Sequence, residues 1–153
     1  MIRLNLISSD DIRCDWLQEL KRYASVPDDS QDALLRSLMK RAALVVQEYA
    51  DSSLLACSFR LDVTDNEDSR IRLYQTVSGV TSVTDGDGGS LGYSLSGGCV
   101  SLSVPAETVS ITYDTAPDEA EIGRLLPVAI RYATALYDGQ DKTELDKIIA
   151  EVC

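Results

Sequence analysis

The stretch DDSQDALLRSLMKRAALVVQEYAD, residues 28–51, carries the strongest structural signal in this sequence of 153 residues. Apolar side chains recur in it every three or four residues, which is the spacing of one face of an α-helix. An acidic turn precedes it, and Asp29 or Ser30 is placed to cap the first helical turn. The predicted apolar positions are Leu34, Leu35, Leu38, Met39, Ala42, Val45, Val46 and Tyr49. The opposite face carries Arg36, Lys40, Arg41, Gln47 and Glu48.

A shorter helix is predicted upstream of this one. Asp10 and Asp11 are candidate N-caps, because short carboxylates accept hydrogen bonds from the free N–H groups of a first turn. The dipeptide Val26-Pro27 ends the helix, since proline cannot continue the hydrogen-bond ladder. Its apolar residues at helical spacing are Trp16, Leu17, Leu20, Tyr23 and Ala24.

Two more helices are predicted after Pro117. Pro127 fits the first position of one of them, because the fixed φ angle of proline suits a helix start. An almost unbroken apolar run from Val128 to Tyr137 follows, and Gly139 marks its end. Thr143 is the candidate cap of a last short helix. The apolar residues of that helix are Leu145, Ile148, Ile149 and Val152.

Between residues 55 and 114 the apolar period changes from helical to two. Cys57, Phe59, Leu61 and Val63 alternate with polar residues, which is the pattern of a strand with one buried face. Further candidate strands are separated by turn-forming sequences, and short strands with tight connections favour an antiparallel sheet. These candidates are residues 71–77, 80–83, 91–95, 100–104 and 109–113.

Together these segments predict an α+β fold. Its helical part is a small bundle of two N-terminal helices and the C-terminal helices, with an inserted antiparallel β-hairpin sheet. The length of the chain favours one domain, residues 1–153. Its parts are residues 1–54 (helical), 55–115 (the β insertion) and 116–153 (helical, with a C-terminal tail).

Six of the nine glycines lie between Ser82 and Gly98, in SVTDGDGGSLGYSLSGG. A calcium loop needs oxygen ligands at fixed spacing, but counted from Asp85 its fifth and twelfth positions are Gly89 and Ser96. A phosphate loop needs a lysine after its last glycine, and residues 41–141 contain none. The Asp-Gly pairs instead predict a flexible turn at the tip of a hairpin. This tip consists of Asp85, Gly86, Asp87, Gly88 and Gly89.

The charge of the chain excludes several classes of partner. With 14 Lys and Arg against 25 Asp and Glu, the formal net charge is -11. Nucleic-acid binding depends on clustered cations, so this balance argues against a specific grip on DNA or RNA. No apolar run approaches the ~20 residues that cross a membrane, and the N-terminus lacks the apolar core of a signal peptide. We therefore expect a soluble, intracellular protein.

Residues suited to catalysis or metal binding are sparse. The sequence has no histidine, and its four cysteines are far apart. Cys14 and Cys57 fit buried packing positions, whereas Cys153 fits an exposed thiol. Acidic clusters at residues 65–68 and 118–121 could act in acid–base chemistry or bind a metal, but their turn and helix-start positions favour solvated carboxylates. No catalytic residue, metal site or cofactor is predicted; a small acidic enzyme or metal-binding domain is an alternative.

Three stretches resemble the head-to-tail connector family of long-tailed bacteriophages, also called head-completion adaptors. The first is the acidic turn and long helix of residues 28–51. The second is GVTSVTDGDGGSLGYSLSG, which is similar to the family's hairpin with a variable, glycine-containing tip. The third is ETVSITYDTAP, residues 107–117, followed by LLPVAIRYATALYDGQD. Residues 115–117 and 138–140 depart from the family's pattern at both ends of the last long helix.

The resemblance implies a structural virion protein that is not an enzyme. Members of the family form a ring, commonly a dodecamer, beneath the portal after DNA packaging, and present the surface on which the stopper or tail assembles. The implied partners are further copies of this chain, the portal protein and a stopper or tail-completion protein. DNA passes through the bore without specific binding, and no membrane is involved. The implied location is the virion neck, and the host cytoplasm during assembly.

Three groups of residues are candidates for these contacts. On the outer face of the long helix, Arg36, Lys40, Arg41 and Glu48 are the candidate subunit interface. In residues 143–153, Leu145, Ile148, Ile149 and Val152 are the candidate portal-docking tail. The glycine-rich tip is expected to reach toward the next ring or a neighbouring subunit. The alternatives are a stopper or tail-completion protein of the same neck, and a bacterial interaction domain unrelated to phage.

Overall fold

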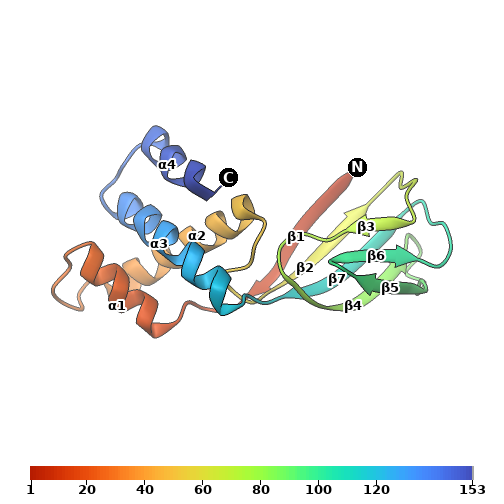
Figure 1. Cartoon of the computed structure of the whole chain (residues 1–153), viewed down its shortest axis with the longest axis horizontal. Helices are drawn as coiled ribbons and strands as arrows, with labels where there is room; N and C mark the ends of the chain where they lie inside the picture. The colour runs from red at the N-terminus through yellow and green to blue at the C-terminus, as the bar shows by residue number, and fades with distance from the viewer. Residues whose placement is uncertain (153) are drawn as a thin grey trace. The chain divides into compact units, whose positions relative to one another are not determined.

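The computed structural model describes residues 1–152, and Figure 1 shows their helices and strands. These residues form two compact units. The β unit comprises residues 1–9 and 56–116, and the helical unit comprises residues 10–55 and the chain from residue 117 onward. The predicted α+β class is confirmed, because the described residues contain four α-helices and two antiparallel sheets.

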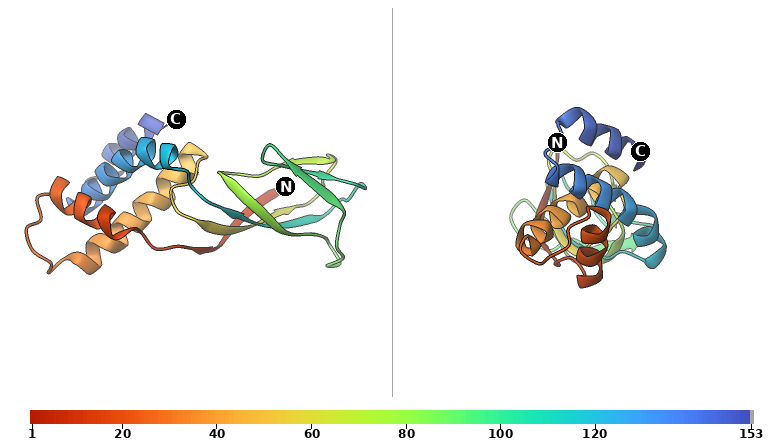
Figure 2. Two further views of the ribbon diagram at one scale, coloured as in Figure 1. Left: turned by 60° about the horizontal axis from the view of Figure 1, so that its bottom comes forward. Right: turned by 90° about the vertical axis from the view of Figure 1, so that its left-hand side faces the viewer.

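The helical unit is built around α2 (Asp32–Ala50) and α3 (Glu119–Tyr137), which lie side by side (Figures 1 and 2). Helix α1 (Cys14–Tyr23) contacts both of them. Helix α4 (Lys142–Ile149) contacts α3, and the 3₁₀ turn η1 (Ala150–Val152) contacts both α2 and α3. Side chains with no exposed surface in this core are Leu20, Leu35, Met39, Ala42, Ala43, Val46, Leu125, Ala129 and Ala133.

Five predicted helix caps are wrong: Asp10, Asp11, Asp29, Ser30 and Thr143. The residues at the N-cap positions of α1, α2 and α4 are Arg13, Gln31 and Asp141. Acidic and hydroxyl side chains before a helix also serve other contacts, which sequence spacing does not reveal. Asp29, for example, accepts a hydrogen bond from Lys21 of α1, and Ser30 donates to Asp28.

Helix α3 begins earlier than predicted. The carboxylate of its N-cap residue Asp118 accepts a hydrogen bond from Glu121 N at 2.7 Å, and the Glu121 carboxylate accepts one from Asp118 N at 3.4 Å. This capping box fixes the helix start. Pro127, predicted as the first residue, therefore lies inside the helix, on its exposed side. The predicted end is confirmed, since Gly139 follows the helix with a left-handed φ of 72°.

The β unit contains two antiparallel sheets that together enclose its core. Sheet A has the strand order β1-β2-β7-β4, and sheet B has the order β3-β6-β5. Their bounds are β1 (Ile2–Ser9), β2 (Cys57–Val63), β3 (Arg70–Arg72), β4 (Val77–Asp85), β5 (Tyr93–Ser96), β6 (Cys99–Leu102) and β7 (Val109–Thr115). The alternation of β2 is confirmed, because Cys57, Phe59, Leu61 and Val63 are all buried while the residues between them are not.

Two features of the β unit differ from the prediction. Residues 2–9, placed in the helical part by the sequence analysis, form β1 and pair with β2 from Ile2–Val63 to Ser9–Cys57. The segment 85–89 turns the chain as predicted, because Thr84 and Ser90 form an antiparallel bridge on either side of it, but the strands beyond, β4 and β5, belong to different sheets. A second tight hairpin, within sheet B, connects β5 and β6, and its Gly97 and Gly98 both have positive φ.

Some side chains on predicted apolar stripes are exposed. Tyr23, Leu34 and Tyr49 are 57%, 48% and 58% exposed. Gln47, predicted on the polar face of α2, is buried. The buried position predicted for Cys57 is confirmed, whereas that for Cys14 is wrong, because Cys14 is exposed. Cys153, predicted as an exposed thiol, lies outside the described residues.

Candidate functional site

A groove of about 390 Å³ lies between α2, α3 and α4 in the helical unit. Val45 of α2 and Leu145 and Ile149 of α4 provide its apolar lining. Its charged lining residues are Arg41, Glu48, Lys142 and Asp146. This mixture of apolar side chains and both signs of charge suits contact with another protein surface more than capture of a small ligand.

The structure brings together two of the four predicted interface residues. Arg41 and Glu48 both line this groove, whereas Arg36 and Lys40 lie outside its lining. Arg36 Nη1 is 3.9 Å from Asp11 Oδ2, a long and largely exposed ion pair. Arg41 and Glu48 therefore border α4, whereas Arg36 faces the segment before α1.

The predicted portal-docking residues belong to α4 and the turn after it. Ile149 is buried, and it is the one buried residue of this helix. Leu145, Ile148 and Val152 are half-buried. In the isolated chain, this C-terminal segment is therefore folded against its own bundle, and it contributes little apolar burial.

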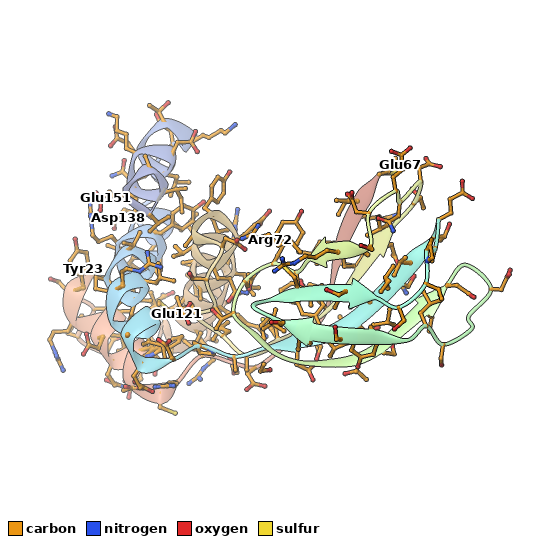
Figure 3. All side chains as sticks on the ribbon, turned by 45° about the vertical axis from the view of Figure 1, so that its right-hand side comes forward. Tyr23, Glu67, Arg72, Glu121, Asp138 and Glu151 are labelled. Carbon is orange, nitrogen blue, oxygen red and sulfur yellow. The ribbon has the colours of Figure 1, made fainter. Side chains whose placement is uncertain are left out.

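A charged contact holds the end of this segment. Arg131 of α3 forms an ion pair with Glu151, and Tyr23 of α1 makes a smaller contribution to raising the pKa of the same guanidinium. In Figure 3, Tyr23 and Glu151 lie on the same side of the helical unit. The hydrogen bond with Glu151, and secondarily its negative charge, raises the pKa of Arg131. Both partners of the ion pair are about 40% exposed, so solvent weakens the attachment.

The glycine-rich tip is organised by one aspartate. Asp85 Oδ1 accepts hydrogen bonds from Asp87 N and Gly89 N, each at 2.9 Å. Asp85 N donates to Gly89 O at 2.8 Å, and Gly88 has a left-handed φ of 83° that favours glycine. The turn thus has a defined hydrogen-bonded shape, which sequence spacing alone did not predict. Its flexibility stays a prediction.

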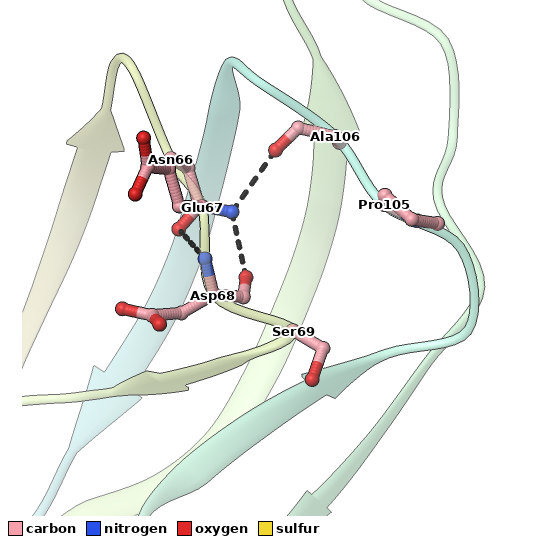
Figure 4. Close-up of a pocket in the computed structure, with 6 residues that line it drawn as sticks. All are labelled: Asn66, Glu67, Asp68, Ser69, Pro105 and Ala106. Atoms are coloured by element: carbon pink, nitrogen blue, oxygen red, sulfur yellow. Dashed lines mark hydrogen bonds between the residues drawn. The ribbon is translucent and has the colours of Figure 1, made fainter.

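The acidic turn at residues 66–69 borders a small cleft of about 150 Å³ (Figure 4). Asn66 Nδ2 donates to Asp68 O at 2.8 Å and to Ala106 O at 2.9 Å, which ties this turn to the segment before β7. Glu67 and Asp68 are exposed. Within residues 1–152, no group of three or more Cys, Asp or Glu side chains is arranged to hold a metal ion. The cleft is explained as a hydrogen-bonded turn.

Two buried polar side chains of the helical unit were not anticipated. Lys21 Nζ is 2.5 Å from Asp29 Oδ1 and 2.8 Å from Asp32 Oδ1, and its side chain is only 8% exposed. Gln47 Oε1 accepts hydrogen bonds from Leu54 N and Leu55 N, both at 3.1 Å. These contacts fix the turns at the two ends of α2, so they are structural. None of the described helices is long and apolar enough to cross a membrane.

No protein-family model and no curated protein matches this sequence. Its fold, however, is similar to that of chains in gene transfer agent (GTA) particles. A chain from the neck of an empty GTA particle, computed with C6 symmetry, matches with a TM-score of 0.68 at 17% identity, over 98% of this chain and 94% of that one.

Two further solved structures give the same result. A chain from the virion of a native GTA particle has a TM-score of 0.66 at 17% identity, over 88% of this chain and 84% of that one. A chain from the neck of a native GTA particle, computed with C12 symmetry, has a TM-score of 0.55 at 17% identity, over 95% and 94%. At this identity the matches establish a shared fold.

Proposed function

We propose that this chain is a structural neck protein, the head-to-tail connector or head-completion adaptor of a tailed phage or phage-like particle. The observation that carries the proposal is the fold match to a GTA neck chain over nearly the whole of both chains. The connector-like stretches in the sequence support the same role independently of that match. The protein would act without catalysis, in the virion neck, after assembling in the host cytoplasm.

The proposed assembly is a homo-oligomeric ring of twelve copies beneath the portal. The C12 symmetry of one of the matched neck reconstructions supports this number. One side of the ring would bind the portal protein, and the other would receive a stopper or tail-completion protein. DNA would leave the head through the bore of the ring, without specific binding.

Three surfaces are assigned to these contacts. The face of α2 with Arg36, Lys40, Arg41 and Glu48 would meet acidic residues of a neighbouring copy. Residues 143–153 would dock on the portal, and residues 143–152 would leave their position on the bundle for this, since a shallow apolar contact and one exposed ion pair hold them there. The tip formed by residues 85–89 would reach the next ring or a neighbouring copy.

The net charge fits a bore through which DNA slides. Each chain carries a formal charge of -11, so twelve copies carry on the order of -130. Acidic residues that line the bore would repel the DNA backbone and keep the exit path from binding it. A reconstruction in which the bore is neutral or basic would contradict this part of the proposal.

Electron microscopy of the chain with its portal tests the main role. The expected result is a ring stacked on the narrow end of the portal, with about twelve times the 16.7 kDa mass of one chain. Deleting residues 141–153 should abolish portal binding and leave the helical content of the rest unchanged by circular dichroism. Binding retained by the truncated chain would contradict the role of the tail, and a portal without any ring would contradict the connector role.

A stopper or tail-completion protein of the same neck is the second candidate. It is favoured by the C6 symmetry of the other matched neck reconstruction. The mass of the assembled ring distinguishes the two, because six copies have half the mass of twelve. Binding to tail tube in place of portal would likewise favour this second candidate.

A further inference from the structure

Two strands of the β unit carry inward-facing apolar side chains that the unit leaves uncovered. On β1, Ile2, Leu4 and Leu6 stand opposite the buried residues of β2, so they share the inner face of sheet A. Nevertheless Ile2 is 57% exposed and Leu6 is 46% exposed. Sheet A has one strand more than sheet B, and β1 is the strand that lacks cover.

The outer edge of β1 also presents unpaired main-chain groups. Thr64 N donates to Met1 O at 2.9 Å, and the Met1 amino group donates to Thr64 O at 2.9 Å. Because bonded and non-bonded pairs alternate in an antiparallel ladder, Ile2, Leu4 and Leu6 direct their N–H and C=O groups away from β2. No strand among the described residues pairs with this edge.

Strand β5 shows the same pattern at the edge of sheet B. Tyr93 and Leu95 stand opposite Leu102 and Val100 of β6, both buried, so they share the inner face of sheet B. Tyr93 is 39% exposed and Leu95 is 41% exposed. Their side chains therefore point toward the level of sheet A without being covered by it.

The two uncovered edges lie on opposite sides of the unit and at the same height. β1 is one outer strand of sheet A, and β4 is the other. The chain that leads into β5 runs along β4, because Leu91 N donates to Val83 O at 2.9 Å. The register places Leu4, Leu61, Ile111 and Val83 in one row across sheet A. The start of β5 thus lies level with the middle of β1.

Charge is matched across the same two sides. Arg3 is exposed on β1, in one row with Asp62, Ser110 and Thr84. Thr84 immediately precedes the acidic tip, in which Asp87 is exposed. A cation at one side of the unit is therefore level with carboxylates at the other, while the uncovered inner faces of β1 and β5 carry no charged residue.

We propose that the β1 edge of one copy packs against the β5 edge of the next copy. The inner face of sheet A and the inner face of sheet B point in opposite directions, so two copies placed side by side cover each other's apolar edge. Ile2, Leu4 and Leu6 would then lie against Tyr93 and Leu95 of the adjacent copy, with Arg3 near its acidic tip. This second contact of the ring rests on the proposed function and is additional to the face of α2.

The partner of each edge is a second copy of the chain, because β1 and β5 both present uncovered apolar side chains and carry opposite charges beside them. Joining two different patches head to tail generates a ring when the rotation between copies closes, whereas pairing β1 with β1 would generate a closed two-fold dimer. The outer edge of β4 is a poorer partner for β1. Near Val83 this edge is already bonded to the chain that leads into β5, and β4 carries two irregularities where β1 has one.

Leu6→Asp and Leu95→Asp test the contact, one on each edge. Each variant should raise the concentration of half-assembly, measured by mass photometry or analytical ultracentrifugation, by about tenfold or more, because a carboxylate would be buried against apolar side chains. Ser94→Asp, on the other face of β5, is the matched control and should assemble like the wild type. Circular dichroism should show that all three variants retain the wild-type fold.

Mixing the two variants separates a head-to-tail contact from other geometries. The Leu6→Asp chain keeps an intact β5 edge, and the Leu95→Asp chain keeps an intact β1 edge. At a concentration at which neither variant assembles alone, an equimolar mixture should therefore form a heterodimer of about 33 kDa, twice the 16.7 kDa of one chain. A mixture that stays monomeric at this concentration, a variant that assembles like the wild type, or a Leu95→Asp chain that dimerises alone as readily as the mixture does would each overturn the proposal.

A charge exchange provides a second test. Arg3→Glu should weaken assembly, and Asp87→Arg in the same chain should restore it, since the two positions meet across the contact. A double variant that assembles no better than Arg3→Glu would contradict the proposed alignment of the two edges.

The outcome is distinguishable from that of the connector proposal. A wild-type ring on the portal that both Leu6→Asp and Leu95→Asp leave intact would contradict this contact alone. A wild-type chain that assembles through these edges but leaves the portal unoccupied would contradict the connector role alone. A chain that stays monomeric in solution and with portal would contradict both.

Discussion

Different kinds of interaction stabilise the β unit and the helical unit of this chain. In the β unit, main-chain pairing sets the register and an almost entirely apolar core fills the space between the sheets. In the helical unit, buried polar side chains fix the connections. Lys21 binds the turn before α2, and Gln47 binds the turn after it. The comparison indicates that the β unit depends on volume and register, whereas the helical unit also depends on a few specific polar contacts.

Removing the largest aromatic side chain of the β core should have the largest effect. Tyr113 has no exposed surface, and its ring stacks on Phe59 with 5.8 Å between centroids. Tyr113→Ala should lower the free energy of unfolding by about 3–5 kcal/mol, because it leaves a cavity. Urea unfolding followed by circular dichroism measures this loss.

The conservative variant Tyr113→Phe is the control. Tyr113 Oη lies 3.3 Å from Tyr74 N and 3.4 Å from Tyr74 O, so Phe removes only hydrogen bonds at a preserved volume. The expected loss is about 0.5–1.5 kcal/mol. If Phe destabilised the protein as much as Ala does, the hydroxyl would matter more than the packing, and the contrast between the units would be wrong.

The polar contact at the end of α2 should come next in size. Gln47→Leu keeps a side chain of similar volume at this position. It removes the oxygen that accepts hydrogen bonds from Leu54 N and Leu55 N. The expected loss is about 2–4 kcal/mol in urea unfolding, since a buried donor that loses its hydrogen bond costs about 1–3 kcal/mol and the two donors share one oxygen. Glu48→Gln, one residue on and exposed, should stay within about 0.5 kcal/mol of the wild type. Equal stability of Gln47→Leu and the wild type would show that volume alone determines the helical unit as well.

The sequence predicted the fold class because periodicity reports which face of an element is buried. The strand pattern of residues 57–63 and the apolar face of α2 were both visible in this way. The signal for β1 was present too, since Ile2, Leu4 and Leu6 alternate with Arg3 and Asn5. It was missed because this strand pairs with residues about fifty to sixty positions later, and a short alternating run cannot be identified as a strand without that distant partner.

The periodic pattern of the sequence could not predict the buried polar contacts. Gln47 lies on the polar face of the helical pattern, and its burial follows from how the next segment folds over it. Tyr49 fits the apolar pattern but is 58% exposed, because α4 covers only part of this surface. The predicted interface and tail residues are surface positions, where packing imposes no pattern. Their roles therefore depend on the assembly tests.

Alkaline titration should weaken the contact at the start of α2. Hydrogen bonds with Asp29 and then Asp32 raise the pKa of Lys21 above the ordinary value of 10.5. Because the folded pKa is the higher one, this contribution to stability is fully present below pH 10.5 and is lost as the pH rises through the folded pKa.

Unfolding free energies measured from pH 8 to 12 should fall more steeply for the wild type than for Lys21→Met. Lys40→Met is the control and should follow the wild type; parallel profiles for Lys21→Met and the wild type would contradict a structural role for this ion pair.

The smallest effect is expected at the exposed turn before α2, where a polar contact lies outside the core. Ser30 Oγ and Ser30 N donate to Asp28 Oδ1 at 2.6 and 3.0 Å, and the side-chain bond is the main cause that lowers the pKa of Asp28 below 3.8. Since the folded pKa is the lower one, the stabilisation is present above pH 3.8 and is lost as the pH falls through the folded value.

Ser30→Ala should move the pKa of Asp28 back toward 3.8, which NMR of its side-chain carboxyl measures. Ser37→Ala, on the exposed surface of α2, is the control and should leave this pKa unchanged. An unchanged pKa in Ser30→Ala would show that the backbone N–H suffices. A change in stability as large as that of Gln47→Leu would show that exposed turns, as well as buried contacts, determine the helical unit.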